Sequence, residues 1–192
     1  QSFLPESPPS IERFELAALS SPATEVGGDF YDFIPVSTDE WGLVIADVSG
    51  KGVPAALFMA LSRTLVRANA VGNPSASEAI QRANALIAED DRSSMFVTLF
   101  YGVLDPKRKT LTYVSAGHNP PLMFPGGGGD TVMLKAKGVA LGIMPEITLE
   151  EKEITIGEGD VVVLYTDGVT EAINENEEQF GQERLALSLI HI

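Results

Sequence analysis

The sequence contains no cysteine, so disulfide bonds and thiolate metal sites are excluded. It has only two histidines, His118 and His191, so a bound metal ion would be held mainly by oxygen atoms. No apolar run reaches the roughly 20 residues that a membrane-spanning helix needs, and the N-terminus lacks a basic stretch followed by an apolar one. These absences predict a cytoplasmic chain without membrane insertion.

Basic residues are also scarce, because 13 Lys and Arg stand against 27 Asp and Glu, which gives a formal net charge of −14. This balance argues against a nucleic-acid partner and is compatible with a site that gathers cations. A chain of 192 residues is long enough for one sizeable domain. Since Gln1 to Ser10 is rich in proline and serine, we expect residues 1–13 to be a linker from an upstream region and residues 14–192 to form one domain.

The most informative stretch runs from Trp41 to Met59. An apolar strand ends there in Asp47, and a turn with Gly50 and Gly52 leads into a helix. A carboxylate at a strand end, followed by glycines and helix-start N–H groups, suits a cation with a phosphate beside it. The same pattern also occurs in ordinary strand-to-helix connections in which the aspartate caps the helix, so this segment alone leaves both alternatives open.

Two further acidic segments favour the cation site. In the segment 26–36, alternation puts Phe30, Asp32 and Ile34 on one face of a strand that begins at Asp29. A hairpin between this strand and the next would bring Asp29 and Asp47 to the same end of the sheet. Far downstream, a second apolar strand ends in an Asp-Gly pair, residues 167–168. We therefore predict a metal-dependent phosphoester site.

The remaining elements follow from periodicity and turn residues. We expect a weak first strand at 14–19, hairpins at 96–115 and 150–165, and a last helix from Gln182. Two helices are expected between the β segments, at 54–70 and 75–89, the second opened by the capping-box pair Ser75 and Glu78. The apolar positions that these two helices present at helical spacing are Leu57, Phe58, Leu61, Leu65, Ala68, Ala79, Ile80, Ala83, Leu86 and Ile87.

Five motifs occur together in a fixed order: GGDFYDF (27–33), IADVSGKGVPAAL (45–57), SAGHNPP (115–121), LGI (141–143) and LYTDGVTEA (164–172). The ordered set resembles the bacterial SpoIIE/RsbU-like branch of the metal-dependent serine/threonine protein phosphatases (PPM, type 2C). The resemblance extends from about Phe14 to Leu185. It implies an α+β fold in which two antiparallel β-sheets pack face to face with helices outside, the αββα sandwich of the PPM phosphatases.

The resemblance also implies a binuclear Mn²⁺ or Mg²⁺ centre. Asp47 would bridge the two ions, the carbonyl of Val48 would bind one and Asp167 the other, and Asp29 would hold or orient ligands at the second ion. Asp47 and Asp167 are therefore the catalytic candidates. Hard divalent cations prefer such oxygen donors, and two of them about 3.5 to 4 Å apart can activate a water against phosphorus. No Ser, Cys or His nucleophile is then needed.

Three accessory candidates lie near these positions: Gly168, Glu171 and Lys51. The resemblance puts Glu171 at the position of a contact to a further, weaker metal ion, although a helix-start glutamate stabilised by the helix dipole is an alternative. Lys51 is the cation nearest to Asp47 in the sequence, with a solvated turn lysine as the alternative. His118 is expected to have a structural role, with its ring hydrogen-bonded to backbone.

The resemblance implies hydrolysis of phosphoserine or phosphothreonine on a phosphorylated STAS-domain anti-sigma factor antagonist, within a bacterial partner-switching pathway. It further implies that the two helices 54–70 and 75–89 act as a switch through which an upstream sensor domain or a homodimer partner sets the metal site. The alternative is a catalytically impaired PPM-fold module that regulates or binds a protein. A nucleotide-binding βαβ domain is disfavoured, because the glycines after Asp47 do not follow its pattern.

The family normally supplies another aspartate well after the Asp-Gly motif, whereas this sequence ends at His191-Ile192 without it. We therefore expect the C-terminal elements of the fold to be missing and the chain itself to be inactive or impaired. The prediction is that calorimetric titration with Mn²⁺ finds the ion next to Asp167 bound weakly or not at all. Two tight Mn²⁺ sites in this chain would refute it.

Overall fold

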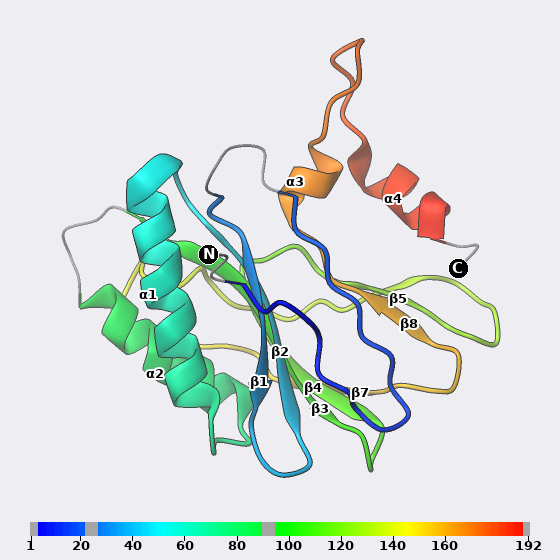
Figure 1. Cartoon of the computed structure of the whole chain (residues 1–192), viewed down its shortest axis with the longest axis horizontal. Helices are drawn as coiled ribbons and strands as arrows, with labels where there is room; N and C mark the ends of the chain where they lie inside the picture. The colour runs from blue at the N-terminus through cyan, green and yellow to red at the C-terminus, as the bar shows by residue number, and fades with distance from the viewer. Residues whose placement is uncertain (1–3, 22–26, 90–94, 190–192) are drawn as a thin grey trace. The chain divides into compact units, whose positions relative to one another are not determined.

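The computed structural model describes residues 4–21, 27–89 and 95–189 (Figure 1). The chain divides into unit 1, formed by Gln1–His118 and Ala136–Ile156, and unit 2, formed by Asn119–Lys135 and Gly157–Ile192. Each unit has its own antiparallel sheet together with helices. The predicted α+β class with two antiparallel sheets is therefore confirmed.

Unit 1 is built on a five-stranded antiparallel sheet in the order β1-β2-β3-β4-β7. The predicted hairpins at its centre are confirmed, since β1 pairs with β2 and β3 pairs with β4. The strands are β1 (Phe30–Pro35), β2 (Trp41–Val48), β3 (Val97–Asp105), β4 (Thr110–Ala116) and β7 (Lys152–Thr155).

The register of β1 and β2 runs from Phe30 opposite Ala46 to Pro35 opposite Trp41. Side chains alternate between the two faces of such a pair. Phe30, Asp32 and Ile34 are the buried side chains of β1, as the alternation in the sequence predicted. Asp29, one residue before β1, belongs to the opposite face.

Helices α1 (Gly52–Ala70) and α2 (Ala76–Ala88) pack against each other and against the sheet of unit 1 (Figure 1). Helix α1 contacts β1 and β2, and α2 contacts β3 and β4. The turn before α1 needs glycine, because Gly50 and Gly52 have φ angles of 99° and 76°. The predicted capping box is confirmed at the start of α2, where the Glu78 amide donates to Ser75 Oγ at 3.2 Å.

Only one stripe of each helix faces the core of unit 1. Phe58, Ile80 and Ile87 are buried as expected, but Leu57 and Leu86 are exposed by 67% and 43%. The periodic pattern of α1 contains two adjacent apolar stripes, and the sheet can cover only one of them. Leu57, Leu61, Ala68 and Leu86 therefore share the helical spacing of the buried positions but are exposed in the structure.

Two predicted β features are absent from the described residues. Residues 14–19 contain no strand beyond a single bridge between Ile11 and Phe14, and Leu19 is 93% exposed. The expected hairpin at 150–165 does not form, because β7 pairs with β4 while the next strand pairs in the other sheet.

Ahead of β1, Leu4 packs against the core of unit 1, and the Tyr31 hydroxyl donates to the Pro5 carbonyl at 3.2 Å.

Unit 2 has a three-stranded sheet in the order β6-β5-β8 and two helices. Its core is formed by Leu122, Tyr165 and Leu185. Burial raises the pKa of the Tyr165 phenol above its ordinary value. The elements are β5 (Leu122–Phe124), β6 (Val132–Met133), β8 (Val161–Val163), α3 (Asp167–Thr170) and α4 (Gly181–Leu189), the last of which begins one residue before the predicted start. Within the described ranges, no helix combines the length and apolarity that crossing a membrane requires.

Asn84 joins α2 to the segment that follows the LGI motif. Its side chain is fully buried, donates to the carbonyls of Met144 and Pro145 at 2.9 Å each, and accepts from the Gly142 amide at 2.9 Å. Leu141 in turn exchanges backbone hydrogen bonds with Val97 at the start of β3. Asn84 thus provides hydrogen-bond partners for three backbone groups, which an apolar side chain could not do.

We predict that Asn84→Ala lowers the free energy of unfolding by about 3 kcal/mol, because it leaves one backbone donor and two backbone acceptors without their hydrogen-bond partner. Urea denaturation followed by circular dichroism measures this change. Asn69→Ala is the matched control, since Asn69 Nδ2 makes one hydrogen bond within α1, and it should cost about 1 kcal/mol or less. Equal costs for the two variants would contradict the prediction.

Candidate metal centre

The end of β2 is held on both sides of Asp47. Across the sheet, Asp47 pairs with Thr98 and Val48 pairs with Val97. Beyond the strand, the Ser49 amide donates to the Phe96 carbonyl at 2.9 Å, and the Phe96 amide donates to Ser49 Oγ at 2.8 Å. These contacts fix the Val48 carbonyl and the turn that leads into α1.

The segment around Gly28 lies directly against this strand end. A Cβ atom on Gly28 would stand 2.8 Å from the Val48 carbonyl oxygen and 3.5 Å from Asp47 Oδ1. Only a residue without a side chain allows so close an approach. Phe30 is opposite Ala46. Continued by one residue beyond the start of β1, the same antiparallel register puts Asp29 opposite Asp47. The prediction that these two carboxylates share one end of the hairpin is confirmed.

Thr98 and His118 form a polar pair next to the backbone of Asp47. Thr98 Oγ1 lies 2.9 Å from His118 Nδ1 and 3.5 Å from the Asp47 carbonyl oxygen. His118 is 7% exposed, and its own carbonyl accepts from Ser115 Oγ at 3.4 Å. Nδ1 of the ring is thus bonded to a side chain, whereas we expected the ring to bond to the backbone.

Asp167 belongs to unit 2, where it is the first residue of α3. Its carbonyl accepts from Thr170 Oγ1 at 3.2 Å and from the Glu171 amide at 2.7 Å. Gly168 and Glu171 are exposed. Glu171 caps the C-terminal end of α3, so the alternative of a helix-start glutamate stabilised by the dipole was wrong.

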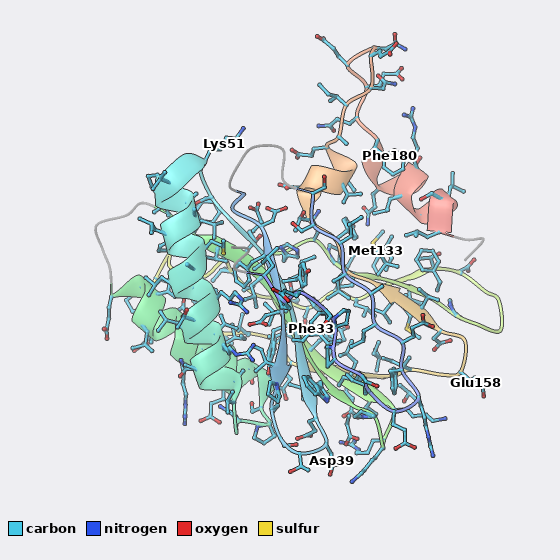
Figure 2. All side chains as sticks on the ribbon, in the orientation of Figure 1. Phe33, Asp39, Lys51, Met133, Glu158 and Phe180 are labelled. Carbon is cyan, nitrogen blue, oxygen red and sulfur yellow. The ribbon has the colours of Figure 1, made fainter. Side chains whose placement is uncertain are left out.

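Lys51 is exposed and stands at the N-cap position of α1. Figure 2 places it at the N-terminal end of that helix, whereas Asp39, in the turn between β1 and β2, lies at the other end of unit 1. Asp39 is paired with Lys107 at 2.7 Å. The two ends of the β1–β2 hairpin therefore carry different acidic groups. Asp29 and Asp47 lie at the open end, and Asp39 lies in the turn at the other end.

The donor set of unit 1 fits a hard divalent cation. It consists of the Asp47 carboxylate, the Val48 carbonyl and Asp29, all of which are oxygen donors of the kind that Mn²⁺ and Mg²⁺ prefer. Across residues 4–21, 27–89 and 95–189, no three His, Asp or Glu side chains are grouped closely enough to form a metal cluster. An ion in unit 1 would therefore depend on the backbone carbonyl as well as on the carboxylates.

A cavity of about 340 Å³ lies at the other end of the sheet from Asp47. Its lining includes Glu40, Asp105, Arg108 and Glu153, so charges of both signs face it. Arg108 and Glu153 pair with each other at 3.3 Å. The cavity contains none of the candidate ligands and is not the candidate site.

Three polar residues that position elements of unit 1 were not identified from the sequence. Thr98 and Asn84 gave no signal beyond a polar residue inside an apolar pattern. Asp32 gave a clearer one, because a carboxylate on the same strand face as Phe30 and Ile34 needs a cationic partner. Its partners are Arg63 and Arg67 of α1.

The chain matches the family model described as Stage II sporulation protein E (SpoIIE) over residues 37–191. It is 36% identical over 217 residues to Protein IcfG of Synechocystis sp. (strain ATCC 27184 / PCC 6803 / Kazusa), covering 98% of this chain and 34% of IcfG. It is 32% identical over 176 residues to phosphoserine phosphatase RsbU of Bacillus subtilis (strain 168), covering 92% of this chain and 52% of RsbU. The chain thus spans between about a third and about half of the length of these relatives.

Solved structures have the same fold. The SiaA-PP2C domain of Pseudomonas aeruginosa superimposes with a TM-score of 0.76 at 24% identity, covering 88% of this chain and 68% of that one. RsbX in complex with magnesium superimposes with a TM-score of 0.64 at 18% identity, covering 89% of this chain and 82% of that one. At these identities the likeness concerns the fold alone.

We predict that Gly28→Ala lowers the free energy of unfolding by about 1 to 3 kcal/mol, because the new methyl group must displace the backbone of Val48. Hydrogen exchange should also accelerate at residues 28–30. Gly127→Ala is the control, since a Cβ there meets no atom within 4 Å, and it should change stability by no more than about 0.5 kcal/mol. Equal stability of both variants in urea would contradict the close approach of Gly28.

Proposed function

The chain belongs to the SpoIIE family, and from that membership we propose that it hydrolyses phosphoserine or phosphothreonine on a protein substrate. The proposal is supported by the similarity to phosphoserine phosphatase RsbU over 92% of this chain. The observation that carries it is the approach of Gly28 to Asp47 Oδ1 and to the Val48 carbonyl, which brings Asp29 to the same hairpin end. An ordinary strand-to-helix connection does not need that approach.

Two divalent ions, Mn²⁺ or Mg²⁺, would serve as cofactors. Asp47, the Val48 carbonyl and Asp29 of unit 1 would hold such ions, and Asp167 of unit 2 stays a proposed ligand. The oxygen donors of unit 1 and the magnesium complex of RsbX support this assignment. When bound, such ions would supply a water of lowered pKa and would neutralise charge on the phosphoryl oxygens.

The protein groups around Asp47 would keep it in place rather than react themselves. Thr98 stands between His118 and the Asp47 backbone, and Ser49 ties the following turn to β3. Neither residue is needed as a nucleophile in a direct attack by water. Gly168, Glu171 and Lys51 remain accessory candidates, and the exposure of all three would leave them open to substrate or to a further ion.

The proposed substrate is a phosphorylated STAS-domain anti-sigma factor antagonist in a partner-switching pathway, which would operate in the bacterial cytoplasm. Nucleic acid is not a proposed partner, given the net charge of −14. An upstream sensor domain or a second copy of the chain would act through α1 and α2. Val53 and Leu57, exposed by 68% and 67% on α1, support such a contact because they present apolar surface outside the core.

A second candidate function is a PPM-fold regulatory or protein-binding module with impaired catalysis. The observation that favours it is the absence, among residues 4–21, 27–89 and 95–189, of a cluster of three acidic or histidine side chains. The two functions differ in one measurable respect, since only the phosphatase would release phosphate in a metal-dependent manner.

We predict that Asp47→Ala reduces Mn²⁺-dependent release of phosphate from a phosphoserine protein by more than about 100-fold in the full-length protein. The reason is that loss of a ligand exceeds the 10- to 100-fold cost of losing an outer partner of a metal site. Asp39→Ala is the matched control, because Asp39 is an exposed carboxylate at the other end of the same hairpin. It should keep wild-type activity.

Retained activity in Asp47→Ala would reject the assignment of the site. Absence of any metal-dependent activity in the wild-type protein, with a phosphorylated STAS-domain substrate present, would favour the regulatory module instead.

A further inference from the structure

Asp32 is a carboxylate buried inside the helix-facing side of the unit 1 sheet. It is 1% exposed and lies between Phe30 and Ile34 on the face that α1 covers. A carboxylate in such surroundings is costly unless cations and hydrogen-bond donors surround it. Asp32 does not belong to the candidate metal centre, because Asp29 and Asp47 lie on the other face of the sheet.

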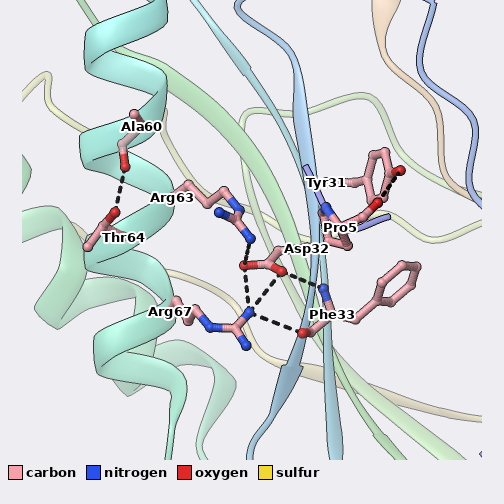
Figure 3. A network of polar contacts seen from close by, with 8 residues as sticks. All are labelled: Pro5, Tyr31, Asp32, Phe33, Ala60, Arg63, Thr64 and Arg67. Atoms are coloured by element: carbon pink, nitrogen blue, oxygen red, sulfur yellow. Dashed lines mark hydrogen bonds and ion pairs between the residues drawn. The ribbon is translucent and has the colours of Figure 1, made fainter. Parts of the chain in front are cut away.

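Helix α1 supplies two guanidinium groups to this single carboxylate (Figure 3). Arg67 Nη1 lies 2.9 Å from both carboxylate oxygens of Asp32, and Arg63 Nη2 lies 3.2 Å from Oδ2. Arg67 also donates to the Phe33 carbonyl at 3.2 Å, and the Phe33 amide donates to Asp32 Oδ1 at 2.9 Å. We call Asp32, Arg63 and Arg67 the ion triad.

The ion triad fixes the position of α1 along β1. Arg63 and Arg67 are four residues apart, which separates their backbones by about 6 Å along the helix axis. Both reach the same carboxylate, so a shift of α1 by even one residue, about 1.5 Å, would lengthen at least one of these contacts. The apolar contacts beside them lack this directional requirement.

The constraint extends to the metal-site end of β1. Asp29 immediately precedes the strand, and the backbone between Asp29 and Asp32 is paired with β2 from Phe30 onward. No loop between them could absorb a displacement. The position of Asp32 against α1 therefore also limits where the Asp29 backbone can lie relative to Asp47.

We propose that Asp32 is a positioning residue, which acts through Arg63 and Arg67 to hold the Asp29 backbone beside the end of β2. Its effect on metal binding rests on the proposed function, whereas its effect on the backbone does not. Stability alone is a weak reason for such a network, because well-packed apolar side chains often replace buried ion pairs without loss. Replacing the ion triad with apolar side chains therefore separates an effect on the position of the backbone from an effect on stability.

The test uses the triple variant Asp32→Leu, Arg63→Met and Arg67→Met in the full-length protein. Three quantities are measured: the urea midpoint, hydrogen exchange at residues 28–31 without metal, and the affinity for Mn²⁺ by calorimetry. Positioning predicts a urea midpoint near that of the wild type, with exchange at residues 28–31 about tenfold faster than in the wild type. Mn²⁺ affinity should fall by about 10- to 100-fold, as it does when outer partners of metal sites are lost. The KM for the phosphoprotein should stay unchanged.

Arg82→Gln is the matched control, because Arg82 forms an exposed ion pair with Glu78 on α2. It should alter none of these quantities. Arg67→Met serves as a second variant should the triple variant fail to fold, since Arg67 is 41% exposed and Arg63 would still hold the carboxylate. In that variant we expect the same changes in exchange and affinity with smaller magnitude.

The proposal is overturned if the chosen variant exchanges at the wild-type rate at residues 28–31. It is equally overturned if exchange rises uniformly across β1 to β4 in proportion to lost stability, which is the result expected of a purely structural ion pair. Failure of the proposed function has a different signature. Wild-type protein that binds no Mn²⁺ would reject the phosphatase, while the exchange at residues 28–31 would still decide the role of Asp32.

Discussion

The antiparallel pairing of β1 with β2 determines where the acidic side chains of unit 1 lie. With Phe30 opposite Ala46, Asp29 falls beside Asp47 on one face, and Asp32 falls among apolar side chains on the other. A slip of one residue would exchange the two faces of β1 and bury Asp29 instead. One register therefore decides both the candidate metal centre and the ion triad, and neither can change without the other.

The features that could be predicted from the sequence are those that depend on neighbouring segments. The β1–β2 hairpin joins strands separated by a short turn, and the Ser75 cap of α2 depends on residues within one helical turn. The meeting of Asp29 and Asp47 follows from the hairpin alone. Even so, the sequence could not reveal how closely Gly28 approaches Val48, because that contact depends on atomic packing rather than on a pattern.

The features that could not be predicted depend on the choice between distant partners. Residues 150–165 have the pattern of a hairpin, yet β7 pairs with β4 and β8 with β5, since each strand joins a sheet edge formed elsewhere in the chain. Leu57 illustrates the same limit for helices, because periodicity defines a stripe without showing whether anything covers it. For Asp32, the sequence indicated a need for cations but not which helix supplies them.

Polar groups between the helices and the sheet of unit 1 fix the position of α1 and α2 relative to the strands. Apolar contacts are not directional and would tolerate sliding of α1 and α2. Asp32 joins α1 to β1, and Asn84 joins α2 to the segment that pairs with Val97 at the start of β3. These two attachments reach the strands on either side of Asp47. A displacement of the helix pair would therefore have to break directional bonds to the strands on both sides of Asp47.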